Sequence, residues 1–226
     1  FQPHTSHFIL QPSSFILLPE GVAPETACFL PNMETAVNLV QDGAPILGER
    51  VLVLGQGMVG LLTASLLREF PLERLVTADQ FELRRKASQA IGVDAVLEGS
   101  GKWKVESGQG TSMASDSRDQ LSSQQTTSKT QLTPQLAYTQ NFDLVFELSG
   151  SPAALNDAIS MTAFSGRIVI GSWYGEKKAP IDLGGAFHRS RIQLISSQVS
   201  TIAPELSGRW DKARRFRVAW EALERI

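Results

Sequence analysis

The feature that most constrains this chain is a glycine-rich turn that directly follows a continuous apolar stretch. Residues 51–54 read Val-Leu-Val-Leu, and the next six residues read Gly-Gln-Gly-Met-Val-Gly. An unbroken apolar run predicts a parallel strand, because alternation disappears when both faces of a sheet are covered. Apolar residues on a helical period then continue up to Pro71. The stretch therefore predicts a strand, a glycine turn and a helix, in that order.

The glycines of this turn have the G-x-G-x-x-G spacing of a dinucleotide-binding turn. Gly55 would permit the sharp exit from the strand, Gly57 would let a pyrophosphate approach the backbone, and Gly60 would let the helix sit close to the sheet. The phosphates would rest on N–H groups at the helix N-terminus, which includes Met58 and Val59. The alternative is a tight turn that binds nothing.

An acidic residue supports the dinucleotide interpretation. Residues 74–78 predict a second strand that ends at Asp79, about 20 residues beyond the last glycine, where a carboxylate would bind the adenosine ribose. A carboxylate repels the additional phosphate of NADP, so the sequence favours NAD over NADP. Arg84 and Arg85 weaken this preference, because either could reach a 2′-phosphate; the alternative is that both lie on a solvated helix face.

The composition excludes several other classes of protein. With 226 residues and a net charge of −2, the chain can form one sizeable core and part of a second, and nothing indicates a nucleic-acid partner. No apolar run approaches the ~20 residues that a membrane span needs. The single cysteine, Cys28, excludes an internal disulfide and a cysteine-rich zinc site, and it indicates a reducing cytoplasm.

The rest of the chain mostly alternates strands with helices. Further strands are expected at 94–97, 142–147, 166–171 and 191–195, with a short edge strand at 181–183. Further helices are expected from Asn32 or Met33 to Val40, at 81–91, at 153–164 and from about Trp210 onward. This pattern predicts an α/β fold, a doubly wound parallel sheet of the Rossmann type. Right-handed crossovers would bring the ends of the first, fourth and fifth strands to one ligand crevice.

Two stretches depart from this alternation. Residues 100–140 are rich in Ser, Gln, Thr and Gly and cannot offset ordering costs of about 1–2 kcal/mol per residue, so we expect a disordered insertion, with a functional lid as the alternative. Residues 8–19 predict two short extended pieces, which need a partner sheet. We therefore expect 1–45 to be the remnant of another domain with a linking helix, and 46–226 to be the nucleotide-binding domain.

Five segments together resemble the medium-chain dehydrogenase/reductases of the zinc-type alcohol and polyol dehydrogenase kind. They are Leu18-Pro19-Glu20-Gly21-Val22 and the residues 48–55, 91–96, 142–150 and 166–169. The resemblance implies hydride transfer between a nicotinamide and an alcohol or carbonyl carbon of a small-molecule substrate. It also implies that the N-terminal part is the remnant of a β-rich, GroES-like catalytic domain, and that the protein is a homodimer paired through an edge strand.

The resemblance further implies where the cofactor lies. It agrees with the pyrophosphate and ribose positions predicted above and adds Arg84 beside the ribose. Two loops would border the nicotinamide, with the residues Ser149, Gly150, Ile170, Gly171 and Ser172. Without the resemblance, these loops would be interpreted as ordinary turns.

The departures from the family concern the metal. Leu30 stands where the last zinc ligand of such enzymes normally lies, and leucine cannot bind a metal. Cys28 and Glu34 are close by, but a lone cysteine is usually a small buried hydrophobe and an acid at a helix start usually complements the dipole. We therefore predict no metal ligand in this chain, zinc only in a complete parent enzyme, and no assigned catalytic residue.

Other functions remain open at this point. One is a nucleotide-binding module without catalytic activity. Another is a methyltransferase that uses S-adenosylmethionine, although such enzymes tend to place an acid near the glycine turn where this chain has Val53 and Leu54. The basic run at 209–217 is interpreted as an amphipathic helix with a solvated basic face rather than a site for an acidic partner. The substrate cannot be identified from the sequence.

Overall fold

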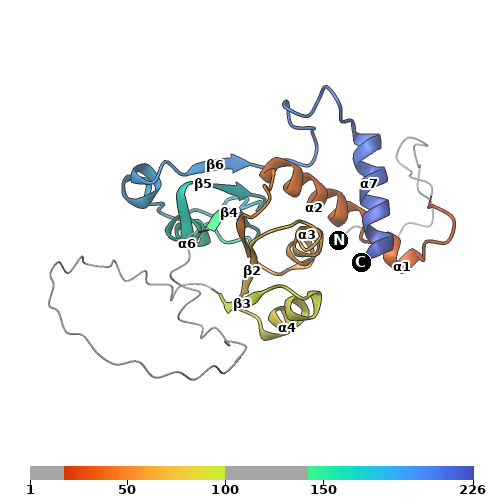
Figure 1. Cartoon of the computed structure of the whole chain (residues 1–226), viewed down its shortest axis with the longest axis horizontal. Helices are drawn as coiled ribbons and strands as arrows, with labels where there is room; N and C mark the ends of the chain where they lie inside the picture. The colour runs from red at the N-terminus through yellow and green to blue at the C-terminus, as the bar shows by residue number, and fades with distance from the viewer. Residues whose placement is uncertain (1–17, 100–141) are drawn as a thin grey trace, which may run out of the picture.

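The computed structural model describes residues 18–99 and 142–226 (Figure 1). Its elements, in chain order, are α1 (Pro24–Ala27), α2 (Leu30–Gly43), β1 (Arg50–Leu54), α3 (Met58–Leu67), β2 (Arg74–Asp79), α4 (Glu82–Ile91), β3 (Ala95–Glu98), β4 (Phe142–Glu147), α6 (Ala154–Met161), β5 (Thr162–Ile170), η2 (Leu183–Phe187), β6 (Gln193–Ser196) and α7 (Lys212–Arg225). The insertion expected at 100–140 lies outside the described residues, as do all but the last two residues of the extended pieces expected at 8–19. Among the helices of the described residues, none has the length and apolar character needed to cross a membrane.

The strands form one parallel sheet in the order β3-β2-β1-β4-β5-β6. β1 lies at the centre, with Val53 opposite Thr77 of β2 on one side and Phe146 of β4 on the other. The chain therefore builds outward from β1 in one direction and then in the other, so that β1 and β4 flank the point where the strand order reverses. This confirms the predicted doubly wound sheet and the adjacency of the first, fourth and fifth strands.

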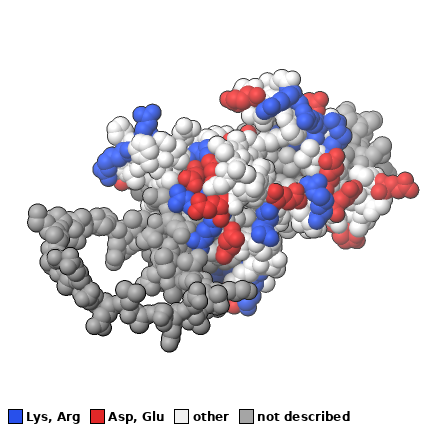
Figure 2. All heavy atoms as spheres, viewed as in Figure 1, with Lys and Arg blue, Asp and Glu red and all other residues white. Residues whose placement is uncertain are grey.

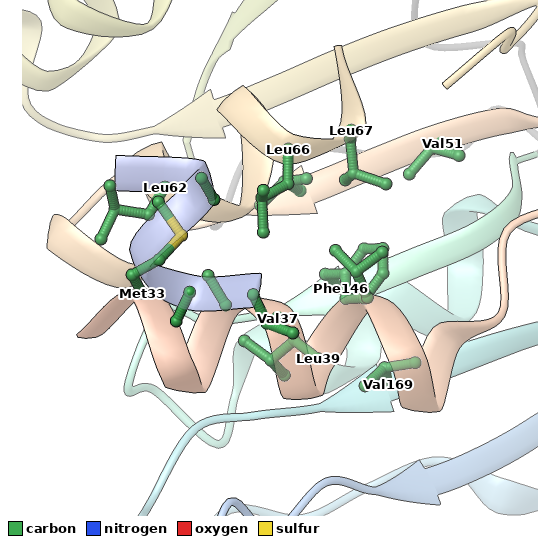
Figure 3. Packing of buried hydrophobic residues seen from close by; sticks show 14 of the residues in the cluster. Met33, Val37, Leu39, Val51, Leu62, Leu66, Leu67, Phe146 and Val169 are labelled. Carbon is green, nitrogen blue, oxygen red and sulfur yellow. The ribbon is translucent and has the colours of Figure 1, made fainter. Parts of the chain in front are cut away.

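Helices cover both faces of the sheet, which explains the unbroken apolar run of β1. Val51 and Val53 belong to a core shared with α2, α3 and α7, whereas Leu52 and Leu54 belong to a core shared with α6. All four side chains are at most 3% exposed. Figure 3 shows the first of these cores, in which Phe146 of the sheet packs among side chains of α2 and α3.

A buried ion pair joins α2 to α7. The guanidinium of Arg215 is fully buried and donates to Glu34 at 2.8 Å and to the carbonyl oxygen of Thr201 at 2.9 Å. Figure 2 shows other lysine and arginine side chains exposed along α7. The expectation of a wholly solvated basic face is therefore wrong at Arg215, because periodicity does not show which basic residue meets an acid on another helix.

Two predicted boundaries and one predicted strand are also wrong. α2 begins at Leu30, because Pro31 occupies the first turn of the helix, where the missing N–H costs nothing. α6 ends at Met161, since the β-branched Thr162 adopts an extended backbone and begins β5. No strand forms at 181–183, because Asp182 caps the turn of η2 by accepting hydrogen bonds from two backbone N–H groups. β6 forms this edge of the sheet instead.

Candidate functional site

The turn after β1 places Gly55 in a conformation that the fold itself requires. Gly55 has a φ of +93°, and its N–H donates to the carbonyl oxygen of Ala78 in β2 at 2.8 Å. A Cβ atom at this position would lie 2.6 Å from the carbonyl oxygen of Leu148. Both the left-handed backbone and the contact with β4 therefore favour glycine here, whether or not a ligand is bound.

The other two glycines of the turn differ from each other. A Cβ atom on Gly60 would lie 1.9 Å from the carbonyl oxygen of Gly55, so the close packing of α3 on the turn requires glycine. Gly57 has an ordinary φ of −72°, and a Cβ atom there would meet nothing within 4 Å. Packing within the described residues therefore gives no reason for glycine at position 57, and the space beside it is open.

The start of α3 offers backbone donors next to this open space. Gly57 is the N-cap residue, and no side chain caps the helix. The first hydrogen bond in the helix runs from the N–H of Leu61 to the carbonyl oxygen of Gly57, at 2.9 Å. The N–H groups of Met58, Val59 and Gly60 precede this bond and have no partner inside the helix. Free N–H groups at the positive end of a helix favour an anion.

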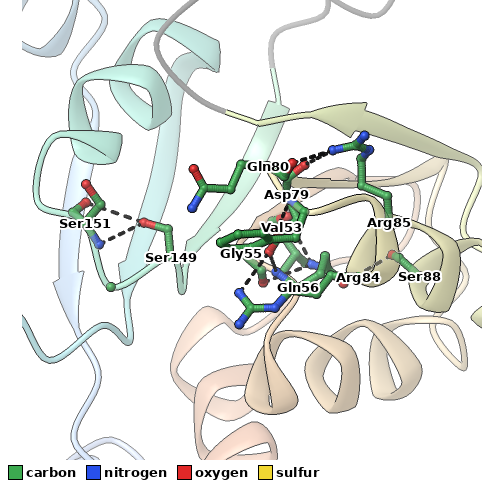
Figure 4. Close-up of polar contacts among 12 residues, drawn as sticks. Val53, Gly55, Gln56, Asp79, Gln80, Arg84, Arg85, Ser88, Ser149 and Ser151 are labelled. Atoms are coloured by element: carbon green, nitrogen blue, oxygen red, sulfur yellow. Dashed lines mark hydrogen bonds and ion pairs between the residues drawn. The ribbon is translucent and has the colours of Figure 1, made fainter.

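Asp79 lies at the end of β2 beside the turn (Figure 4). Its side chain is buried, and one carboxylate oxygen accepts the N–H of Gln56 at 2.7 Å while the other accepts the N–H of Phe81 at 2.8 Å. Nη1 of Arg84 lies 3.6 Å from the first of these oxygens. The carboxylate is thus held in place, and each oxygen keeps a second lone pair for another donor.

The two arginines of α4, which the sequence could not distinguish, have different environments. Arg84 is about half exposed and lies over the ring of Phe81, 4.8 Å from its centroid. Arg85 instead donates to the carbonyl oxygens of Asp79 and Gln80, at 3.0 and 2.7 Å. The guanidinium of Arg85 is therefore engaged with the backbone, and only Arg84 faces the cavity described next.

A cavity of about 170 Å³ opens at the carboxyl edge of the sheet, between the ends of β1 and β2 and the start of α6. Figure 4 shows Ser149 and Ser151 on one side of this region and Asp79 with Gln80 on the other. Four of the predicted residues line the cavity: Gly55, Asp79, Arg84 and Ser149. The lining residues that the sequence analysis missed include Gln80, Gly99, Ser151 and Asp157. Gln80 and Gly99 directly follow strands, a position that could have identified them.

The predicted loops after β4 and β5 are joined to each other. The N–H of Gly150 donates to Oγ of Ser172 at 2.9 Å, and Nζ of Lys177 donates to the carbonyl oxygen of Gly150 at 2.9 Å. The N–H groups of Gly171 and Ser172 both donate to the carbonyl oxygen of Glu147, at 3.1 and 3.2 Å. Ile170 is the last residue of β5, so all five predicted residues of these loops lie together at the carboxyl edge.

The side chain of Glu147 connects these loops to the end of β4 and was missed by the sequence analysis. It is fully buried, and its Oε1 accepts the N–H of Ser149 at 2.9 Å and also the Ser149 hydroxyl. Its Oε2 accepts the hydroxyl of Tyr174. Burial, together with this hydrogen bond and the charge of Glu147, raises the pKa of Tyr174 well above its ordinary value. Tyr174 therefore stays a neutral donor.

The candidate metal residues have other roles in the fold. Leu30 is buried in the core with α3, and Glu34 is paired with Arg215. Cys28 is exposed, so the interpretation of this residue as a small buried hydrophobe is wrong. Within residues 18–99 and 142–226, no group of three or more His, Cys, Asp or Glu side chains is arranged to hold a metal ion.

Comparisons with known proteins agree with this architecture, although no protein-family model matches the chain. The chain is 27% identical over 151 residues to an L-threonine 3-dehydrogenase of Saccharopolyspora erythraea, covering 67% of this chain and 36% of that protein. Its structure is similar to galactitol-1-phosphate dehydrogenase of Escherichia coli, with a TM-score of 0.65 and 13% identity over 92% of this chain and 51% of that one. It is also similar to acetophenone reductase of Geotrichum candidum in complex with NAD, with a TM-score of 0.61 and 14% identity over 92% of this chain and 49% of that one.

These matches confirm the resemblance to medium-chain alcohol and polyol dehydrogenases that the sequence motifs indicated. The two solved structures establish the fold, since their sequences are too different from this one to show more. The chain spans about 36% of the length of the L-threonine 3-dehydrogenase and about half the length of the two solved structures. What those proteins bind and transform thus bears on this chain only as a hypothesis.

Proposed function

We propose that this chain is the cofactor-binding part of an NAD-dependent medium-chain dehydrogenase that transfers hydride between the nicotinamide and an alcohol or carbonyl carbon of a small molecule. The observation that carries the proposal is Gly57. Glycine at 55 and 60 follows from packing, whereas at 57 a side chain would enter open space. A pyrophosphate that approaches the backbone at this point would explain why a side chain is absent.

The residues of the turn fit such a group. The free N–H groups at the start of α3 would hold the pyrophosphate, because they combine donors with the positive end of the helix. The carboxylate of Asp79 would accept hydrogen bonds from the adenosine ribose through its remaining lone pairs, with Arg84 alongside. The loops at Ser149-Gly150 and Ile170-Gly171-Ser172 would border the nicotinamide. When bound, NAD supplies the hydride acceptor of the reaction.

The environment of Asp79 supports NAD rather than NADP. Two backbone N–H groups hold this buried carboxylate in place, so it cannot swing away from an approaching group. An additional phosphate on the ribose would bring its negative charge close to the carboxylate. Arg84 is about half exposed and lies beside Asp79, so its charge could offset part of this repulsion, whereas the guanidinium of Arg85 is engaged with the backbone. We therefore expect a preference for NAD that depends on Asp79.

The remaining assignments extend the same proposal. Residues 1–45 would be the remnant of a catalytic domain with a linking helix, and residues 46–226 would be the cofactor domain. A homodimer would pair through the outer edge of β6, since this strand ends the sheet on that side. Catalytic groups, and zinc if the enzyme uses it, would belong to a complete parent enzyme. The assignment to the cytoplasm rests on the single cysteine and stays a prediction.

The experiment that tests the proposal compares the full chain with its Gly57→Ala variant. Calorimetric titration with NADH, NADPH and S-adenosylmethionine measures binding, and a thermal melt measures stability. We expect wild type to bind NADH more tightly than NADPH and not to bind S-adenosylmethionine. Gly57→Ala should melt like wild type but bind NADH about tenfold more weakly, a loss of about 1.4 kcal/mol. Equal NADH affinity in the two proteins would show that the pyrophosphate does not contact this turn.

A further inference from the structure

Both loops at the β4–β5 end of the carboxyl edge are held by one buried residue, Glu147. Its carboxylate accepts three donors, which are the N–H and hydroxyl of Ser149 and the hydroxyl of Tyr174. Its backbone carbonyl accepts two more, from Gly171 and Ser172. A single residue at the end of β4 thus fixes the loop that follows its own strand and the loop that follows β5.

The bonds to Glu147 fix the backbone on both sides of a large exposed residue. Trp173 is 91% exposed, but its two neighbours in the chain are anchored. On one side, Ser172 donates its N–H to Glu147 and accepts the N–H of Gly150; on the other, Tyr174 donates its hydroxyl to Glu147. The backbone of this segment is thus fastened at both ends, which orders the loop before any ligand arrives.

The direction of the Tyr174 hydroxyl shows what kind of role it has. It points inward to the buried carboxylate, and loss of its proton would place two negative charges in direct contact. A tyrosine that acts as a proton donor to substrate needs its hydroxyl directed at the reacting oxygen. Tyr174 is therefore suited to positioning the loop and not to proton transfer.

We propose that the Glu147–Tyr174 pair is a clamp that positions the two loops against the nicotinamide half of the cofactor, and that Tyr174 is a positioning residue for that half alone. This inference rests on the proposed function. The adenosine half would lie with Asp79 and the glycine turn. Ser149 lines the cavity together with Asp79, but its N–H is held by Oε1 of Glu147 and not by Tyr174. Loss of the clamp should therefore weaken binding of the whole dinucleotide without weakening binding of its adenosine part.

The test measures NADH and ADP binding by calorimetry in wild type and in Tyr174→Phe. ADP carries the adenosine and pyrophosphate without the nicotinamide. We expect the variant to bind NADH about tenfold more weakly and ADP as tightly as wild type. Unchanged NADH binding would overturn the clamp, and so would an equal loss for both ligands, because that is what a merely structural role predicts. If wild type binds neither ligand, the proposed function itself fails.

Two further variants keep the test decisive. Ser207→Ala removes a hydroxyl that donates to the backbone of Pro204, and neither residue lines the cavity, so it should change neither affinity. Glu147→Gln preserves the volume and one acceptor oxygen, which serves the Ser149 bonds. Its NH₂ group would then face Tyr174, so the hydroxyl would have to accept from a neutral donor in place of its present, stronger bond to a carboxylate. The NADH loss of Glu147→Gln should be smaller than that of Tyr174→Phe, and the double variant should bind no more weakly than Tyr174→Phe. If the two losses add, the residues do not act as one clamp.

Discussion

The two halves of the carboxyl edge are built in different ways. At the β1–β2 half, the shape is set by close packing of backbone on backbone. A Cβ atom on Gly55 or Gly60 would lie too close to a carbonyl oxygen, so neither position has room for a side chain. At the β4–β5 half, the shape is set by side chains, since Glu147, Ser172 and Tyr174 join two loops that would otherwise be separate. The glycine turn of the first half is fixed by steric exclusion in addition to its hydrogen bonds, whereas the loops of the second half are fixed by hydrogen bonds.

This difference determines how each half should respond to substitution. A new atom on Gly55 or Gly60 collides with backbone that directly follows β4 or β1, so the collision can be relieved only by moving the end of a strand or the start of α3. In the β4–β5 half, the hydrogen bond between Gly150 and Ser172 joins two partly exposed residues, so water can replace a lost partner there, and the net cost is about 1 kcal/mol. The predictions below test this contrast.

The largest effect is expected for Gly60→Ala. The added Cβ would lie 1.9 Å from the carbonyl oxygen of Gly55, so the start of α3 must move away from the sheet. We expect a loss of about 3 kcal/mol in the free energy of unfolding, at the upper end of what overpacking costs. Urea unfolding measures this loss, with Gly57→Ala as the matched control, because the same methyl there meets nothing. Similar stability in the two variants would contradict the steric account of this half.

The next effect is expected for Asp79→Asn. An amide offers one acceptor oxygen to the N–H groups of Gln56 and Phe81, so one of them faces an NH₂ group, at a cost of about 1–3 kcal/mol. The loss of charge should also remove the preference for NADH over NADPH. Arg85→Gln is the control, and it should leave the preference unchanged, since that guanidinium is bound to backbone carbonyls. A preference that persists in Asp79→Asn would place the ribose elsewhere.

A smaller effect is expected for Ser172→Ala in the β4–β5 half. The change removes the acceptor of the Gly150 N–H, and this loop is partly exposed, so water can replace the hydroxyl. We expect a stability loss of about 1 kcal/mol, measured by urea unfolding, with a weaker affinity for NADH and an unchanged affinity for ADP. A loss as large as that of Gly60→Ala would show that the two halves do not differ in the way described.

The same difference explains what the sequence could predict. The strand, glycine turn and helix are consecutive in the chain, and glycine spacing specifies local geometry, so the positions of Gly55, Gly60 and Asp79 relative to the sheet followed from pattern alone. The meeting of the ends of the first, fourth and fifth strands at one edge followed from the handedness of crossovers, although the full strand order was not predicted. Even there, the pattern could not decide between Arg84 and Arg85, because two adjacent residues on one helix point in different directions.

The contacts that escaped prediction join residues far apart in the chain. Tyr174 lies 27 residues beyond Glu147, and Arg215 lies 181 residues beyond Glu34. An acid at the end of an apolar strand carries no signal about its partner, and a basic residue on an amphipathic helix is expected to face solvent. Such pairs depend on how loops and helices pack, which hydrophobic periodicity does not specify.

The smallest effect is expected for Asp143→Asn, at the opposite end of β4 from Glu147. Partial burial raises the pKa of Asp143, but hydrogen bonds from the backbone and guanidinium of Arg50, together with its charge, lower the pKa more, to below the ordinary 3.8. A carboxyl group whose pKa is lower in the folded than in the unfolded state stabilises the fold at pH values above its unfolded pKa. This stabilisation is lost as the pH falls through the folded pKa. Both side chains are about a third exposed, so we expect the substitution to lower the free energy of unfolding by less than about 1 kcal/mol.

Urea unfolding should show wild type more stable than the Asp143→Asn variant at pH 7 but equal to it near pH 2, with NADH and ADP affinities at pH 7 unchanged. A change in either affinity would mean that the two halves of the carboxyl edge are coupled through β4 and cannot be treated as separate.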